Sequence, residues 1–206
     1  MTSSPRPVPP ARQFALHIVR GFDEAEREPL ARLYWDAFGG KLGRVLGPRD
    51  KALAFVAGGL SPSHAIVARE AGEPVGIAGY RDRDGALVDI APGPMRGVYG
   101  LGGALGRSAL LALRHRDTDN RRFLVDGLAV AEGVRGQGIG SRLIEALAEV
   151  ARERGHPAIR LDVAEGNDGA ARLYARLGFR AVEEQGGGVL DRLAGGRAVT
   201  VMERAP

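Results

Sequence analysis

The fold is predicted from one continuous segment of the chain, residues 125–147. It reads Val125-Asp126-Gly127-Leu128-Ala129-Val130, then Ala131-Glu132-Gly133-Val134-Arg135-Gly136-Gln137-Gly138-Ile139-Gly140-Ser141, then Arg142-Leu143-Ile144-Glu145-Ala146-Leu147. The first part predicts a strand, because it is apolar and partly β-branched. Gly127 in that strand indicates a bulge or a close approach by another part of the chain. The last part predicts a helix with one buried face, since apolar residues recur with helical spacing at Ile139, Leu143, Leu147 and Val150.

The loop between this strand and helix has the composition of an anion site. Gly136, Gly138 and Gly140 lack the Cβ atoms that would keep a ligand away from main-chain N–H groups. The first helical turn adds unpaired amides and the positive end of the helix dipole, and Arg135 adds a full charge. A phosphate or pyrophosphate is therefore the expected occupant. A glycine-rich turn that binds nothing is the alternative.

Two better-known phosphate loops do not fit the spacing. A dinucleotide fingerprint beginning at Gly138 requires a glycine where Leu143 stands, and a P-loop requires Gly-Lys-Ser/Thr where the chain has Gly138-Ile139-Gly140. The pattern that remains is Arg-x-x-Gly-x-Gly after a Leu-x-Val strand.

A second motif follows the helix. Residues 158–164 alternate apolar and charged side chains, which predicts a strand. Next comes Asn167-Asp168-Gly169-Ala170-Ala171-Arg172-Leu173-Tyr174-Ala175-Arg176-Leu177-Gly178-Phe179, which predicts a short helix with an Asn or Asp cap and Gly178 as its left-handed stop.

Together, the loop and Asn-x-x-Ala-x-x-Leu-Tyr-x-x-x-Gly-Phe resemble the two signatures of the GNAT family of acyl-CoA-dependent N-acyltransferases. The resemblance covers about residues 125–179 and does not specify a substrate. It implies an α/β (α+β) fold with a mixed, mainly antiparallel twisted sheet, helices on both faces, and a splay between the strands at Leu128 and Leu161. It also implies that acetyl-CoA is the acyl donor.

The resemblance also implies roles for individual residues. The backbone of Leu128, Ala129 and Val130 would pair with pantetheine and supply the oxyanion contact. Asn167 would touch the pantetheine arm, and Tyr174 would protonate the departing thiolate. The pyrophosphate would lie on the loop residues Arg135, Gly136, Gln137, Gly138, Ile139, Gly140 and Ser141.

Two catalytic assignments keep alternatives. The Tyr174 ring is also placed to pack on Phe179 around Gly178. Asp126 is a candidate general base, but it is equally suited to pairing with Arg121 or Arg122, or to binding a cationic acceptor. Asp162 is expected to face away from its apolar neighbours and is not assigned to the site. The histidines His17, His64, His115 and His156 lack metal-ligand spacing, and each is expected to be a surface or strand residue.

Composition limits the remaining classes. The 206 residues suit one domain, and no apolar run approaches the ~20 residues of a membrane span. With no cysteine there is no disulfide, no thiolate metal site and no cysteinyl acyl-enzyme, so direct transfer is favoured. The net charge of +4 suits a polyanionic donor but is too dispersed to indicate nucleic acid. Neither a metal nor a membrane partner is expected.

The ends and the amino-terminal half give further expectations. Residues 1–12 predict a flexible tail without the apolar core of a signal peptide, and residues 13–206 predict one acetyltransferase domain in the cytoplasm. A strand at 14–19 and a helix at 24–38 follow, with residues 39–43 breaking that helix and permitting a lid. A second helix is predicted from Pro48 to Val56. Aromatic residues of this pair are candidates for the acceptor pocket or for the core: Tyr34, Trp35, Phe38 and Phe55.

Residues 64–69 and 75–80 predict a hairpin, which residues 86–90 extend. A helix within 91–120 is expected either to shape the substrate site or to form a subunit contact in a homodimer. The predicted activity is transfer of an acetyl group to a primary amine of a small molecule or protein in a ternary complex. A sensor that binds acyl-CoA without turnover is the alternative, and a longer acyl donor also stays open.

Overall fold

In the computed structural model, residues 15–88, 96–100, 123–186 and 198–206 are described. They form one seven-stranded sheet in the order β1-β2-β3-β4-β5-β7-β6. All neighbouring strands are antiparallel except β4 and β5, which are parallel. The strands are β1 (Leu16–Arg20), β2 (Ala65–Glu70), β3 (Glu73–Arg81), β4 (Phe123–Val130), β5 (Ile159–Ala164), β6 (Arg180–Gln185) and β7 (Val199–Arg204).

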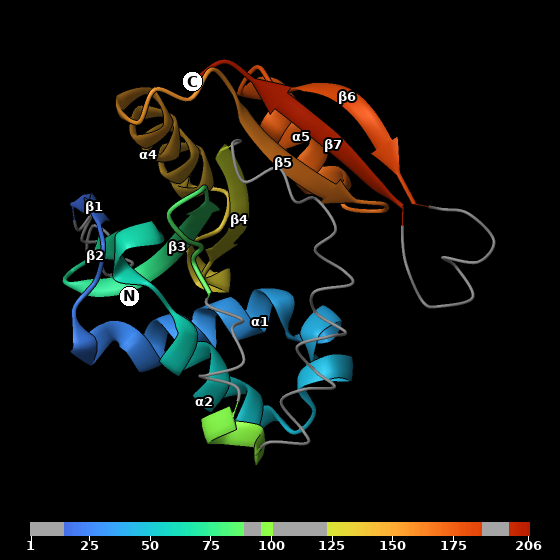
Figure 1. Cartoon of the computed structure of the whole chain (residues 1–206). Coiled ribbons are helices and arrows are strands. Elements are labelled where there is room, and N and C mark those ends of the chain that lie inside the picture. The colour runs from blue at the N-terminus through green and yellow to red at the C-terminus, as the bar shows by residue number, and fades with distance from the viewer. Residues whose placement is uncertain (1–14, 89–95, 101–122, 187–197) are drawn as a thin grey trace, which may run out of the picture.

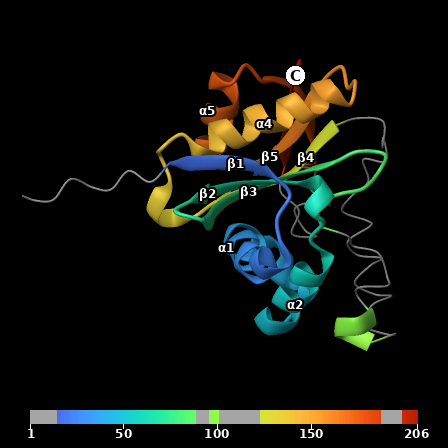
Figure 2. The same cartoon turned by 90° about the vertical axis from the view of Figure 1, so that its left-hand side faces the viewer.

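Helices cover both faces of this sheet (Figures 1 and 2). The helices α1 (Arg27–Leu46) and α2 (Arg49–Gly59) lie on one face, and α4 (Ile139–Glu153) lies on the other, with α5 (Asp168–Arg176) beside β5 and β7. Three short 3-10 turns complete these ranges: η1 (Glu24–Glu26), η2 (Pro62–His64) and η3 (Glu132–Val134). The predicted mixed, mainly antiparallel sheet flanked by helices is confirmed. None of these helices combines the length and apolar character that a bilayer crossing requires.

The period-two pattern of the central strands divides the core into two clusters. On one face, Val67 and Ile77 pack with Leu30 and Phe55 from α1 and α2. On the other face, strand residues such as Ile66 pack with the apolar stripe of α4, where the side chains of Ile139, Leu143, Ile144 and Leu147 are all buried. Full burial of one such side chain contributes about 2 kcal/mol to folding stability. The packing of α4 on the sheet therefore stabilises it more than its helix propensity does.

The predicted splay lies between β4 and β5. These strands share only two residue pairs, Phe123 with Ile159 and Leu124 with Arg160. Beyond them β4 stays paired with β3 as far as Val130, while β5 pairs with β7 along its whole length. Among the described residues, the later part of β4 therefore has no strand neighbour on its β5 side.

The predicted break of the first helix at residues 39–43 is wrong. Helix α1 continues through these glycines to Leu46, so they form no lid between two helices. The Trp35 ring lies over the backbone at Gly39, where an added Cβ would stand 2.7 Å from Trp35 Cε2, and it also approaches Gly43. The glycines leave room for an aromatic ring on their own helix, and a gain in packing outweighs their low helix propensity.

Most other boundaries agree with the sequence to within a few residues. The hairpin is β2 and β3, the second helix ends at Gly59, and Gly178 adopts the left-handed conformation with φ of 84°. A strand was predicted at 86–90. Its described part, residues 86–88, forms no strand, and Val88 makes an isolated bridge with Leu60. The tail at 1–12 and most of 91–120 lie outside the described residues, so the single domain at 13–206 stays a prediction.

The glycines of α1 give a stability test. Gly40→Ala adds a methyl group where nothing lies within 4 Å, so we expect it to raise the free energy of unfolding by about 0.5–1 kcal/mol through helix propensity. Gly39→Ala must displace the Trp35 ring and is expected to be about 1–2 kcal/mol less stable than Gly40→Ala. Urea unfolding of both variants measures the difference. Equal stabilisation would contradict the packing of Trp35 on Gly39.

Candidate active site

The anion site predicted at the start of α4 has the backbone geometry it needs. Gly136 and Gly138 both have positive φ, 80° and 82°, and Gly138 is the N-cap of α4. The first bond of the helix runs from the Arg142 N–H to the Gly138 carbonyl at 3.1 Å. The amides that precede Arg142 at this helix start have no intrahelical acceptor, because the first four N–H groups of a helix never do. A negatively charged group is favoured there.

Two polar side chains of this loop have other contacts. Arg135 Nε donates to the Val130 carbonyl at 3.0 Å, which ties the loop to the end of β4 while the side chain stays exposed. The Ser141 side chain lines a separate hollow of about 370 Å³ between β1 and α4. The loop therefore offers main-chain amides and one exposed guanidinium.

A bulge in β4 directs Asp126 into the splay. Gly127 pairs with Gly79 and Val125 pairs with Tyr80, so Asp126 is the extra residue. The sequence predicted a bulge or a close approach at Gly127, and both occur: a Cβ at Gly127 would lie 3.1 Å from Tyr34 and 3.3 Å from Phe38. The bulge leaves the Asp126 carboxylate 3.5 Å from Arg81 Nη2 at the end of β3.

A cavity of about 510 Å³ occupies the gap between β4 and β5. It brings together four residues that the sequence assigned to the site: Asp126 and Leu128 from β4, and Asn167 and Tyr174 from α5 and its N-cap. The cavity wall does not include Ala129, Val130 or the loop at 135–141; Ala129 is buried in the core on the α1 side. The cavity thus reaches β4 at Leu128, and the loop contacts the same strand at the Val130 carbonyl.

Tyr174 takes part in both of the arrangements expected for it. Its ring packs on Phe179, with centroids 5.7 Å apart, and it also lines the cavity. Burial raises the pKa of Tyr174 to about 12, so the phenol keeps its proton through the neutral range. A protonated tyrosine facing the cavity is able to donate that proton.

Asn167 has a local role as well. Its side-chain oxygen accepts from the Ala170 N–H at 3.3 Å, which caps α5. Because Asn167 also lines the cavity, the cap fixes its side chain at the cavity wall.

Sequence reasoning missed several cavity residues. Asp162 was left out because strand alternation turns it away from Leu161 and Val163, yet all three line the cavity. The gap beside β5 exposes side chains from both faces of that strand, which alternation does not reveal. Arg81 and Gln185 also lie in the wall, and their placement depends on pairing between distant strands.

The amino-terminal aromatic residues divide between core and cavity. Phe38 lines the cavity and packs against Tyr34, with ring centroids 4.6 Å apart and the rings tilted by 44°. Tyr34 and Phe55 are buried in the core, and burial raises the pKa of Tyr34 well above its usual range. Helix α1 thus contributes Phe38 to the wall and supports it with Tyr34.

The model of the acetyltransferase (GNAT) family matches residues 27–179, and the chain belongs to this family. The resemblance stated from the sequence is therefore confirmed. Within the described ranges, no group of three or more potential metal-binding side chains is found.

Individual relatives resemble parts of the chain. A thialysine N-epsilon-acetyltransferase of Sus scrofa is 40% identical over 67 residues, which is 32% of this chain and 39% of the relative. A streptothricin acetyltransferase of Streptomyces lavendulae is 42% identical over 60 residues, 29% of this chain and 32% of the relative. The chain thus matches well under half of the length of these curated relatives.

A crystal structure of a polyamine N-acetyltransferase of Drosophila melanogaster superimposes with a TM-score of 0.58 at 20% identity. The match covers 93% of this chain and all of the other. At this identity the likeness is one of fold.

The buried phenol of Tyr174 gives a pH test. Its pKa is about 12 in the folded protein and ~10 when unfolded, so the folded state holds the proton more tightly. The buried phenol therefore contributes on the order of 2 kcal/mol to the free energy of unfolding. That stabilisation is fully present below pH ~10 and is lost as the pH rises toward 12. We expect Tyr174→Phe to lose less stability than wild type between pH 10 and 12 in urea titrations. Identical losses would contradict the burial of the hydroxyl.

Proposed function

We propose that this chain is an N-acetyltransferase that transfers an acetyl group from acetyl-CoA to a primary amine by direct attack in a ternary complex. The observation that carries the proposal is the cavity between β4 and β5. There a buried, protonated tyrosine, the Asp126 carboxylate and the part of β4 beyond its two pairs with β5 face one space.

The donor site we propose extends from this cavity to α4. The edge of β4 at Leu128, Ala129 and Val130 would hydrogen-bond the pantetheine arm, and Asn167 would contact the same arm. The amides from Gly136 to Ser141, with the Arg135 charge, would hold the pyrophosphate. The geometry that supports this is the pair of left-handed glycines and the helix start behind them.

Acyl transfer to an amine requires a neutral amine, stabilisation of an oxyanion and a proton for the departing thiolate. We assign the last to Tyr174, because burial keeps its phenol protonated and the proton is therefore available to the departing thiolate. We assign removal of the amine proton to Asp126, directly or through water. Its position in the bulge puts the carboxylate in the cavity wall beside Arg81.

The acceptor is proposed only as a primary amine. Of the described residues, the cavity wall carries two carboxylates, Asp126 and Asp162, and one guanidinium, Arg81, so charged groups border the space available to the acceptor. The named relatives include enzymes for thialysine and streptothricin. A cytoplasmic location and a homodimer remain predictions from the sequence.

A thiol-release assay over a panel of primary amines tests the function and the role of Tyr174 together. Wild type should consume acetyl-CoA with at least one amine class. Tyr174→Phe should lower kcat by about 10²–10⁴ with little change in KM for acetyl-CoA, because the lost group acts on the leaving thiolate. Tyr80→Phe is the matched control, since Tyr80 lies outside the cavity wall.

Thermal unfolding with acetyl-CoA separates the enzyme from the sensor. A ligand at a hundredfold excess over Kd stabilises the folded state by ~2.7 kcal/mol. Stabilisation without release of the coenzyme A thiol in the presence of any amine would favour the sensor. No stabilisation would contradict the proposed donor site.

Asp126→Asn tests the proposed base. We expect kcat/KM for the amine to fall by at least about 100-fold near pH 7 and to recover partly at higher pH, where more of the amine is already neutral. Asp162→Asn on the opposite wall should cause a smaller loss without this pH dependence. A rise in KM at unchanged kcat would instead make Asp126 a binding residue for a cationic acceptor.

A further inference from the structure

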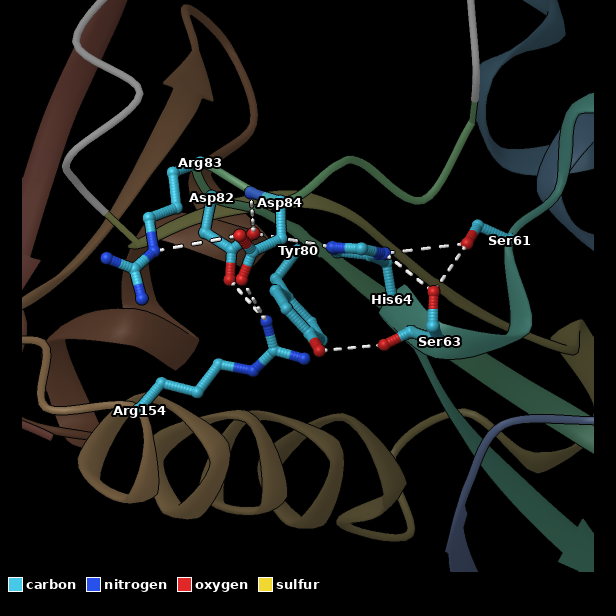
Figure 3. Close-up of polar contacts among 8 residues, drawn as sticks. All are labelled: Ser61, Ser63, His64, Tyr80, Asp82, Arg83, Asp84 and Arg154. Atoms are coloured by element: carbon cyan, nitrogen blue, oxygen red, sulfur yellow. Dashed lines mark hydrogen bonds and ion pairs between the residues drawn. The ribbon is translucent and has the colours of Figure 1, made fainter.

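A second set of polar side chains lies apart from the cavity at the splay. Figure 3 shows the core of this set, which we call the His64 cluster: Ser61, Ser63, His64, Asp82 and Arg154. His64 was expected from the sequence to be a surface or strand residue, but its side chain is only 7% exposed and that of Asp82 only 1%. Buried polar side chains normally have hydrogen-bond partners, so the contacts of these two neighbouring groups call for a structural or functional explanation.

The cluster forms a serine–histidine–aspartate chain of hydrogen bonds. Asp82 Oδ1 lies 3.3 Å from His64 Nε2, and His64 Nδ1 lies 3.0 Å from Ser63 Oγ. A carboxylate only accepts, so Nε2 carries the imidazole proton and Nδ1 presents a lone pair. Two hydroxyls lie near Nδ1, Ser61 Oγ at 3.4 Å and Ser63 Oγ at 3.0 Å, and the shorter contact makes Ser63 the donor to the imidazole, which is the arrangement that activates a serine nucleophile.

The carboxylate end of this chain is held on several sides. Arg154 Nη1 donates to Asp82 Oδ2 at 2.7 Å, and the Asp84 N–H donates to Oδ1 at 2.9 Å. These donors favour the charged carboxylate, and although burial opposes them the pKa of Asp82 is lowered below its ordinary value. Asp82 is thus fixed as the negatively charged partner of the imidazole.

The imidazole and the serine are also held in place. The His64 ring packs near Tyr80, with centroids 4.9 Å apart, and on the backbone of Gly85, where a Cβ would come within 2.7 Å of Cε1. The Tyr80 hydroxyl donates to the Ser63 carbonyl at 2.8 Å. Such supporting contacts position a reactive group before any substrate arrives.

The serine end of the chain is open to solvent. Ser63 is exposed and borders a hollow of about 490 Å³ that is also lined by His64 and Asp82. Among the described residues, this hollow and the cavity at the splay share only Arg81 in their walls. A small molecule can therefore reach Ser63 without entering the proposed acetyl-transfer site.

We propose that Ser63, His64 and Asp82 form a second, nucleophilic site that cleaves small activated esters. The Ser63 oxygen forms a bond to the ester carbonyl carbon, its proton passes to His64 Nδ1, and the carbon–oxygen bond to the leaving alcohol breaks as that alcohol takes the proton. Water then attacks the acyl-serine with His64 as base, which releases the carboxylic acid and restores the hydroxyl. This site does not depend on the proposed acetyltransferase function.

A fluorophosphonate probe tests the nucleophile directly. Ser63 should displace fluoride from phosphorus, and mass spectrometry of the native protein should find the adduct on Ser63. Ser63→Ala should lose the adduct, whereas Ser61→Ala removes the neighbouring hydroxyl of the same cluster and should still give an adduct on Ser63. Tyr174→Phe should react like wild type, which separates this site from the acetyl-transfer site. The proposal would be overturned by an adduct on Ser61, by the absence of any adduct, or by an adduct that forms equally well in the unfolded protein.

A cysteine replacement gives a second test that does not require ester turnover. The chain has no cysteine, so Ser63→Cys carries a single thiol, both alone and combined with His64→Gln. A thiol paired with the imidazole holds more thiolate, and we expect iodoacetamide to alkylate Ser63→Cys at least about tenfold faster than Ser63→Cys with His64→Gln at neutral pH. In urea the two rates should become equal. Equal rates in the folded proteins would make the His64 cluster purely structural and overturn the proposal.

Discussion

The separation of β4 from β5 after two residue pairs is the constraint on which the rest of the structure depends. In a continuous sheet, the outer edge of β4 would be satisfied by β5, and no space would exist between them. Here the two strands are held to other partners, β3 and β7, and diverge. The gap leaves main-chain hydrogen-bonding groups of β4 beside a cavity, which is the kind of site a strand-like ligand can occupy.

Elements on both sides of the sheet make this gap usable. Helix α4 packs its apolar stripe on one face and brings its amino-terminal amides to the end of β4. Helix α1 covers the other face and supplies Phe38 to the cavity wall. The bulge at Asp126 turns a carboxylate into the space, and α5 places Tyr174 across from it. Packing energy on two faces thus supports a polar site at the point where the sheet opens.

Strand β3 connects this site with the His64 cluster. Arg81 and Asp82 are consecutive at the end of β3 and contact Asp126 and His64 respectively. Arg154, directly after α4, donates a hydrogen bond to the Asp82 carboxylate. Consecutive residues of a strand point to opposite sides, so one strand end can serve two polar groups that do not touch.

The sequence by itself determined the strand, glycine loop and helix from residue 125 to 153, and the capped helix that carries Asn167 and Tyr174. Each of these depends on local periodicity, caps and glycines. Tertiary structure decided the rest, because it depends on contacts between distant segments. Trp35 packing keeps α1 helical through Gly39, the gap beside β5 brings Asp162 into the cavity wall, and β2–β3 pairing with α4 brings Asp82 to His64 and Arg154. Local pattern carries no information about such pairings.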